Sequence, residues 1–150
     1  MPELNFTPEQ RAAIDTRGST VLVSAAAGSG KTRVLTERLM AYLTDAENPV
    51  DIDRFLVITY TRAAAAELRS RILDGIYARI ASDPENRRLR RQVALCARAE
   101  IGTIHSFCAD FLRAAIHLIQ IRDNRFLIGN GYIQGRKLFF LHENIQFISC

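Results

Sequence analysis

Apolar residues follow two different spacings along this chain, and their alternation predicts alternating strands and helices. Continuous apolar runs at 21–23 and 55–58 are typical of short strands buried in a parallel sheet, and residues 100–103 form a third, weaker run. After each run, apolar residues recur at helical spacing, from Lys31 to about Leu43, from Ala64 to Ile80 and from Ile104 to Ile119. This order predicts an α/β fold with a parallel sheet flanked by helices.

The first helix is predicted from its start signals at Thr7-Pro8-Glu9-Gln10. Thr7 is a capping residue, Pro8 suits the first helical position, and Gln10 completes a capping box. A second interpretation stays open for Gln10, because a glutamine amide also matches the N6 and N7 edge of adenine. Local signals alone favour the cap.

Residues 24–32 read Ser-Ala-Ala-Ala-Gly-Ser-Gly-Lys-Thr and follow the first strand directly. They match the phosphate-binding pattern G-x-x-x-x-G-K-[ST] except at its first position, where Ala25 replaces glycine. Glycines at 28 and 30 let several backbone N–H groups point at one phosphate, in front of a helix N-terminus. Lys31 is expected to reach the outer phosphates and Thr32 to ligate Mg²⁺. The loop therefore predicts nucleotide binding.

The second and third strands are also followed by polar residues at helix starts. Thr61 is a natural N-cap, yet a hydroxyl at a helix N-terminus also grips phosphate, and Tyr60 offers a stacking surface for a base. His105, at the third junction, is by itself typical of a hydrogen-bonded core residue. The helix after it has a predicted apolar face made of Cys108, Phe111, Leu112, Ala115 and Ile119.

Asp83-Pro84 ends the long second helix, and a basic helical segment follows. A solvated helix face is the favoured interpretation of this segment, and a nucleic-acid-binding stripe is the alternative. Its arginines are Arg87, Arg88, Arg90, Arg91 and Arg98.

Composition narrows the class of protein. A chain of 150 residues with 48% hydrophobic and 24% charged residues suits one globular domain, and its net charge of +4 is compatible with an anionic partner. Cys96, Cys108 and Cys150 are too scattered for a zinc site or a disulfide framework, which favours the cytoplasm. No secretion signal or membrane-spanning run is expected.

Taken together, these stretches resemble the N-terminal part of UvrD/Rep-like superfamily 1 DNA helicases, and most closely the AddAB-type helicase-nuclease subgroup. Phe6–Gln10 resembles the Q motif, which makes Gln10 an adenine contact, and 24–32 resembles helicase motif I, where alanine at the first position is an ordinary variant. The resemblance implies that Lys31 is catalytic. The implied nucleotide-binding residues are Gln10, Ala25, Ala26, Ala27, Gly28, Ser29, Gly30, Lys31, Thr32 and Arg33.

Two further blocks carry the resemblance. Thr59–Leu68 is similar to motif Ia. Tyr60 keeps the aromatic ring of that motif and Thr61 keeps its hydroxyl, while Arg62 replaces the usual Asn. Thr103–Cys108 is similar to the Thr-Phe-His-Ser-Phe-Cys block that touches single-stranded DNA. The residues implied to contact DNA are Tyr60, Thr61, Arg62, Thr103, His105 and Ser106.

The resemblance implies a partial RecA-like P-loop NTPase domain that uses ATP and Mg²⁺ to move on single-stranded DNA and unwind double-stranded DNA in double-strand-break repair. The resemblance also implies a nuclease-type partner subunit, and it implies no association with a membrane. The motifs extend to about residue 117, so residues 1–115 are expected to form the start of a motor domain. Residues 116–150 are expected to be a divergent tail, either a truncation or a frameshift product, with a hairpin turn at Asn130-Gly131.

The carboxylates that complete the family's chemistry are not identified in the sequence. The run Leu138–Glu143 ends in His-Glu where the family's Walker B motif has Asp-Glu. Two alternatives therefore accompany the helicase hypothesis. One is an inactive remnant that at most binds ATP or DNA, and the other is an unrelated P-loop kinase, which leaves Thr103–Cys108 unexplained.

Overall fold

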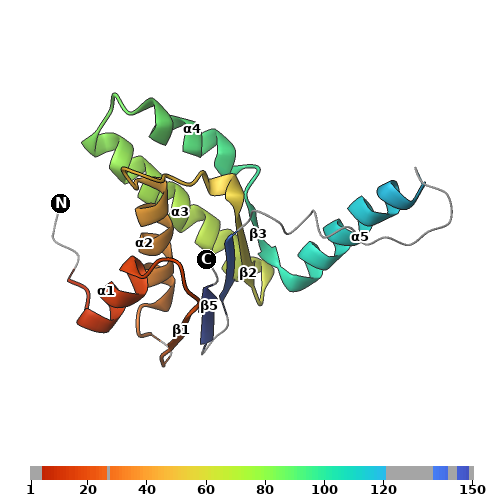
Figure 1. Cartoon of the computed structure of the whole chain (residues 1–150), viewed down its shortest axis with the longest axis horizontal. Coiled ribbons are helices and arrows are strands. Elements are labelled where there is room, and N and C mark those ends of the chain that lie inside the picture. The colour runs from red at the N-terminus through yellow and green to blue at the C-terminus, as the bar shows by residue number, and fades with distance from the viewer. Residues whose placement is uncertain (1–4, 27, 121–136, 142–144, 149–150) are drawn as a thin grey trace.

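The computed structural model describes residues 5–26, 28–120, 137–141 and 145–148 as an α/β domain with one sheet (Figure 1). The first half contains α1 (Pro8–Asp15), β1 (Val21–Ser24), α2 (Lys31–Leu43), the 3₁₀ turn η1 (Ile52–Arg54) and β2 (Phe55–Thr59). The second half contains α3 (Arg62–Ser82), α4 (Arg87–Cys96), β3 (Glu100–Thr103), α5 (Ile104–Gln120), β4 (Lys137–Leu141) and β5 (Ile145–Ile148). The predicted order of strands and helices is confirmed.

The sheet has the strand order β1-β5-β4-β2-β3. β2 is parallel to β3 and to β4, whereas β5 is antiparallel to both of its neighbours, β4 and β1. Four strands therefore run in one direction, and the carboxyl ends of β1, β2 and β3 lie at the same edge. The connections after β1 and β3 lead into helices that begin at this edge, which places the predicted phosphate loop and the predicted DNA contacts along it.

The antiparallel strand β5 departs from the predicted parallel sheet. β4 ends at Leu141 and β5 begins at Ile145, and so short a connection joins neighbouring strands only in the antiparallel sense. The hairpin turn predicted at Asn130-Gly131 lies outside the described residues, as do His142 and Glu143. Leu138–Leu141, the apolar part of the run that imitates Walker B, forms β4 beside β2.

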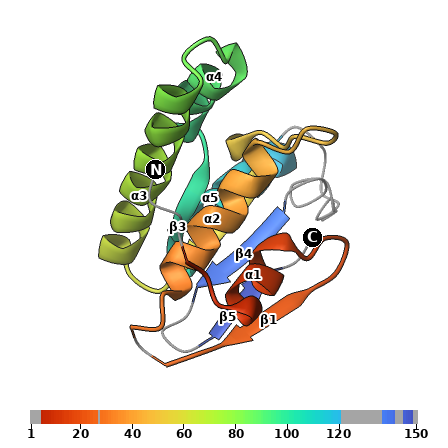
Figure 2. The ribbon, with the colours of Figure 1, turned by 90° about the vertical axis from the view of Figure 1, so that its left-hand side faces the viewer.

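The main core lies between the sheet and helices α2, α3 and α4. Leu39, Phe55 and Ile72 are fully buried in it, and Leu68 and Ile76 complete the α3 face that the four-residue spacing predicts. A smaller cluster of Ala13, Ile14 and Val34 joins α1 to α2. Figure 2 shows α1 and α2 lying together in front of the strands.

β1 is less buried than its apolar run predicts. Val21 and Val23 are half-buried, but the side chain of Leu22 is 59% exposed. β1 is an edge strand with β5 as its neighbour in the sheet, and only one of its faces is packed against α1 and α2. The prediction of a buried strand was wrong for β1, where no residue is fully buried, and correct for β2, whose five residues are all buried.

Two residues of the predicted apolar face of α5, Cys108 and Leu112, are exposed in the part of the chain that the structure describes. This helix projects away from the rest of the molecule (Figure 1). Cys108 is exposed, Leu112 is 59% exposed and Phe111 is half-buried. The periodicity correctly predicted a helix, but helical periodicity does not specify which element packs against the apolar face.

Candidate nucleotide and DNA sites

The predicted phosphate loop connects the carboxyl end of β1 to the first turn of α2. Gly28 and Gly30 have φ angles of +78° and +84°, in the left-handed region where a side chain is strained. Gly30 is also the N-cap of α2, so the loop enters the helix through a conformation that favours glycine. The backbone N–H groups of the first turn of α2 have no partners within the helix, which is the arrangement that suits an anion.

The Lys31 side chain folds back over this loop. Its ammonium group donates hydrogen bonds of 2.7 Å to the carbonyl oxygens of Ala25 and Ala26. These two carbonyls hold the cation above the loop, where an incoming phosphate oxygen is a stronger, charged acceptor. The contacts at 25 use only the backbone, so they do not depend on glycine at that position.

The side chain of Gln10 joins the start of α1 to the phosphate loop. Its amide oxygen accepts from Thr7 N at 3.0 Å and its own backbone N–H donates to Thr7 Oγ1 at 3.3 Å, which forms the predicted capping box. Its Nε2 also donates to Ser29 O at 3.1 Å. Each polar atom of the amide keeps one further hydrogen-bonding position, a lone pair on the oxygen and an N–H on the nitrogen. Capping and adenine binding are therefore compatible in this geometry.

A pocket of about 540 Å³ lies between α1, β1 and the loop, and Gln10, Ala25, Ser29 and Lys31 are among its lining residues. Arg33 is not one of them. Its guanidinium lies 4.6 Å from the centre of the Phe6 ring, and that of Arg11 lies 5.3 Å from it. Ala26, Gly28, Gly30 and Thr32 belong to the same loop without lining this pocket, and Ala27 is outside the described residues.

Magnesium has one expected protein ligand here. Thr32 is half-buried in the first turn of α2, directly after Lys31, and a hydroxyl oxygen is a hard ligand of the kind that Mg²⁺ prefers. The described residues contain no cluster of three His, Cys, Asp or Glu that could hold a metal ion. This donor set suits an ion whose other ligands are phosphate oxygens and water, as in phosphate-loop sites.

The predicted DNA contacts come together at the ends of β2 and β3. A groove of about 480 Å³ is lined by Tyr60, Arg62, Thr103, His105 and Ser106. Tyr60 is 66% exposed there, and an exposed aromatic ring is the kind of surface on which a base stacks. Sequence reasoning missed Arg113, which also lines the groove and pairs with Asp110 at 2.5 Å. Its signal was its place two helical turns after Ser106, on the same face of α5.

Thr61 does not line this groove. Its hydroxyl oxygen accepts from Ala64 N at 3.1 Å and caps α3, which is the structural interpretation that the sequence left open. The hydroxyl is exposed, and its hydrogen stays available to an acceptor such as phosphate.

Thr103 and Ser106 cap the start of α5 reciprocally. Ser106 N donates to Thr103 Oγ1 at 3.2 Å, while Thr103 N donates to the Ser106 hydroxyl at 2.9 Å. The Ser106 hydroxyl in turn donates to Thr103 O at 2.8 Å. A Cβ at Gly102 would lie 2.7 Å from Ser106 Oγ, so any larger residue there would displace this hydroxyl. Both residues thus shape the groove through the turn that they stabilise.

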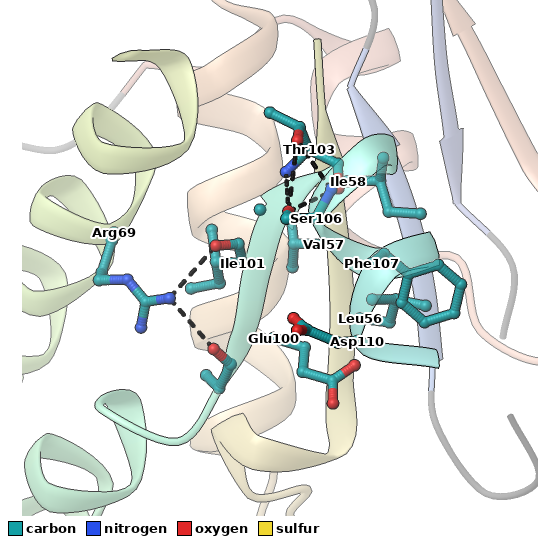
Figure 3. A pocket seen from close by; sticks show the side chains of 12 residues that line it. Leu56, Val57, Ile58, Arg69, Glu100, Ile101, Thr103, Ser106, Phe107 and Asp110 are labelled. Carbon is teal, nitrogen blue, oxygen red and sulfur yellow. Dashed lines mark hydrogen bonds between the residues drawn. The ribbon is translucent and has the colours of Figure 1, made fainter. Parts of the chain in front are cut away.

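Figure 3 shows a neighbouring cavity of about 250 Å³ below this turn, with Leu56, Phe107 and Asp110 on its wall. Arg69 of α3 also lines this cavity, and its guanidinium donates to the carbonyls of Cys96, Ala99 and Ile101 at 2.5, 3.2 and 3.2 Å. Arg69 therefore braces the strand whose end carries the groove. No sequence signal distinguished this arginine from the exposed ones.

The arginines of the basic segment, four on α4 and Arg98 just after it, are divided between structural contacts and solvent. Arg88 and Arg91 lie 2.8 Å and 3.7 Å from the carboxylate of Asp51, and Arg90 donates to the carbonyl of Pro84. Arg87 and Arg98 are exposed. The exposure of Arg87, Arg90 and Arg91 is what a solvated helix face predicts, and the contacts of Arg88 and Arg91 to Asp51 add local ion pairs to it. No helix in the described part of the chain is long and apolar enough to cross a membrane.

Comparison with known proteins identifies the family. A model of the UvrD/REP helicase N-terminal domain matches residues 6–139, and the chain belongs to this family. The match continues past residue 117, further than the motifs alone indicated. The division into 1–115 and 116–150 stays a prediction.

Several relatives are named as a subunit of an ATP-dependent helicase/nuclease. The protein from Clostridium acetobutylicum is 49% identical over 126 residues, which are 84% of this chain and 10% of the relative. Those from Thermoanaerobacter sp. strain X514 and Clostridium novyi are 52% and 50% identical over 125 and 130 residues, or 83% and 87% of this chain. The chain spans about a tenth of the length of these relatives.

Proposed function

We propose that this chain is the ATP-binding and single-stranded-DNA-contacting part of a DNA helicase. The observation that carries the proposal is the placement of two sites at one edge of one sheet. The phosphate loop follows β1. The groove that Tyr60 and His105 line lies at the ends of β2 and β3. A helicase couples ATP turnover to movement on DNA. This coupling requires that ATP binding at one site change the affinity for DNA at the other, which is easier when one domain carries both sites.

The nucleotide-binding residues proposed are Gln10, the loop from Ala25 to Thr32, and Arg33. Lys31 and a magnesium ion held by Thr32 stabilise the charge that develops during phosphoryl transfer to water. Gln10 selects adenine through its remaining donor and acceptor. Support for Arg33 is weaker, since its guanidinium contacts Phe6 and lies outside the pocket.

The DNA-binding residues proposed are Tyr60, Thr61, Arg62, Thr103, His105 and Ser106. Tyr60 stacks on a base, and Arg62 and His105 supply side chains beside it in the same groove. Thr61 contributes only if its hydroxyl hydrogen reaches phosphate while its oxygen caps α3.

The relatives' name suggests the larger setting, in which the whole protein belongs to a helicase/nuclease that acts on single- and double-stranded DNA together with a partner protein. Double-strand-break repair in the cytoplasm is the proposed role. By itself this chain is expected to bind ATP and DNA without turnover. The sequence supplies a phosphate loop, a lysine and a threonine, but it has His142-Glu143 where the family's Walker B motif has Asp-Glu. An arginine from a second domain is worth about 10³–10⁵ in rate in nucleotide hydrolases.

The test uses the purified 150-residue chain. Calorimetry with Mg·ATP and fluorescence anisotropy with a labelled single-stranded oligonucleotide should both show binding, while phosphate release stays at the background rate with and without DNA. Absence of binding to both ligands would contradict the proposal. DNA-stimulated phosphate release that Lys31→Ala abolishes would show that the chain is active by itself. Turnover that DNA does not stimulate would favour the kinase alternative.

A further inference from the structure

The most deeply buried charged group in the described residues is the guanidinium of Arg38. Arg38 lies on α2 and is 0% exposed. It is the largest by volume of the fully buried side chains in the described residues. A buried cation is strongly unfavourable unless hydrogen bonds replace its hydration. What Arg38 contacts therefore indicates what it holds in place.

Arg38 contacts the last turn of α1. Its Nη1 donates to the carbonyl oxygens of Ala13 and, at 3.4 Å, Ile14. The last carbonyls of a helix lack intrahelical partners and form the negative end of the helix dipole. A fixed cation therefore satisfies these groups in both hydrogen bonding and charge.

A second arginine supports the same corner. Arg17 donates to Ile14 O at 2.6 Å, and its guanidinium lies 4.1 Å from the centre of the Tyr42 ring. Arg38 lies 5.5 Å from that ring centre and donates to the Tyr42 hydroxyl at 3.4 Å. The carboxyl end of α1 is thus fastened to α2 by polar contacts that are specific in direction. The buried apolar residues of α1 at this corner are Ala13 and Ile14, which pack against Val34 of α2.

The amino end of the same helix carries Gln10, whose amide contacts Ser29 of the phosphate loop at 3.1 Å. Ala13 lies three residues after Gln10, which is about 4.5 Å along a helix axis. A helix of 8 residues transmits a displacement of one end directly to the other. From this geometry we infer that Arg38 is a positioning residue for base selection, which holds α1 so that the Gln10 amide meets the adenine edge. This inference rests on the proposed nucleotide site.

The test compares the affinities of ATP, GTP and inorganic tripolyphosphate, each with Mg²⁺, by calorimetry on the 150-residue chain. Arg38→Met should lose about tenfold of the preference for ATP over GTP, because one well-placed bidentate contact discriminates bases by that order. Its affinity for tripolyphosphate should stay within about twofold, since Lys31 and the loop are intact. In a Gln10→Ala background, Arg38→Met should have no further effect on the preference.

Arg79→Met is the matched control. Arg79 pairs with Glu37 of α2 at 2.8 Å and links α2 to α3 without a contact to α1. It should leave the base preference unchanged. Hydrogen exchange gives a second readout, in which Arg38→Met should speed the exchange of the α1 amides and leave those of α3 slow. If Arg38→Met fails to fold, both measurements are made on Arg38→Lys. This variant retains the positive charge but not the planar guanidinium that donates to two acceptors at once.

Parallel losses of ATP and tripolyphosphate affinity would show that Arg38 acts only on stability, and unchanged exchange in α1 would also overturn the inference. A wild-type chain that binds ATP and GTP equally would overturn it and leave the phosphate site standing. A wild-type chain that binds none of the three ligands would contradict the proposed nucleotide site as well.

Discussion

The ammonium group of Lys31 lies 2.7 Å from the carbonyl oxygen of Ala25, the residue that replaces the first glycine of the phosphate-binding pattern. The side chain at that position takes no part in the contact. The loop therefore holds its lysine by backbone groups alone, and the glycines that the backbone does require are at 28 and 30. This geometry explains physically why alanine is tolerated at 25.

Lys31→Ala is expected to abolish ATP binding. The variant loses charge-assisted hydrogen bonds to the outer phosphates, each worth about 1.5–3 kcal/mol. Calorimetry with Mg·ATP is the measurement, and Arg11→Ala is the control, because it removes an equal charge from an exposed position on α1. Unchanged ATP affinity in Lys31→Ala would refute the assignment of the loop.

Tyr60→Ala is expected to weaken single-stranded DNA binding by about 1–3 kcal/mol, the cost of losing one stacked base. ATP affinity should hardly change, since Tyr60 does not line the pocket beside the loop. Anisotropy titrations of the two ligands make the comparison. Tyr77→Ala serves as the control, because Tyr77 is 54% exposed on α3 and outside the groove. If DNA and ATP affinities fall together, Tyr60 has a structural role.

Substitutions at Thr61 can distinguish its role as the N-cap of α3 from a contact to DNA. Asn and Asp both cap helices well, so Thr61→Asn and Thr61→Asp should melt within a few degrees of the wild-type chain, whereas Thr61→Ala should lose about 0.5–2 kcal/mol of stability. The negative charge of Thr61→Asp should repel a phosphate and weaken DNA binding relative to Thr61→Asn. Equal DNA affinities of these two variants would place the DNA backbone away from this residue.

The buried thiol of Cys96 leads us to expect that the protein loses stability at alkaline pH. Burial raises the pKa of its thiol above the ordinary value of 9.0, although the nearby Arg69 lowers it in part. The folded chain therefore retains the thiol proton at pH values where the unfolded chain releases it. The stabilisation is complete below about pH 9 and is lost as pH rises from there through the folded-state pKa.

Urea denaturation between pH 7 and pH 10.5 tests this expectation. Relative to Cys96→Ala, the wild-type free energy of unfolding should fall above pH 9 with a slope of at most about 1.4 kcal/mol per pH unit. Cys108→Ala, which alters an exposed thiol, should follow the wild type. Identical slopes for the wild type and Cys96→Ala would contradict the assignment.

Much of this protein was predictable from short-range signals in its sequence. The capping box of Thr7 and Gln10, the helix Lys31–Leu43 and the strand Glu100–Thr103 all lie where the sequence places them. Capping, turn chemistry and periodicity act over a few residues, so short stretches of sequence suffice to predict these elements.

Only the tertiary structure decided the contacts between distant parts of the chain. The amide of Gln10 reaches Ser29 across 19 positions, and the guanidinium of Arg38 reaches Ala13 across 25. Arg38 and Arg69 look like any other arginine in the sequence, because burial and hydrogen-bond partners depend on how helices pack. The same reason applies to Leu22, whose apolar run predicted a buried strand, although the edge position of β1 leaves this side chain 59% exposed.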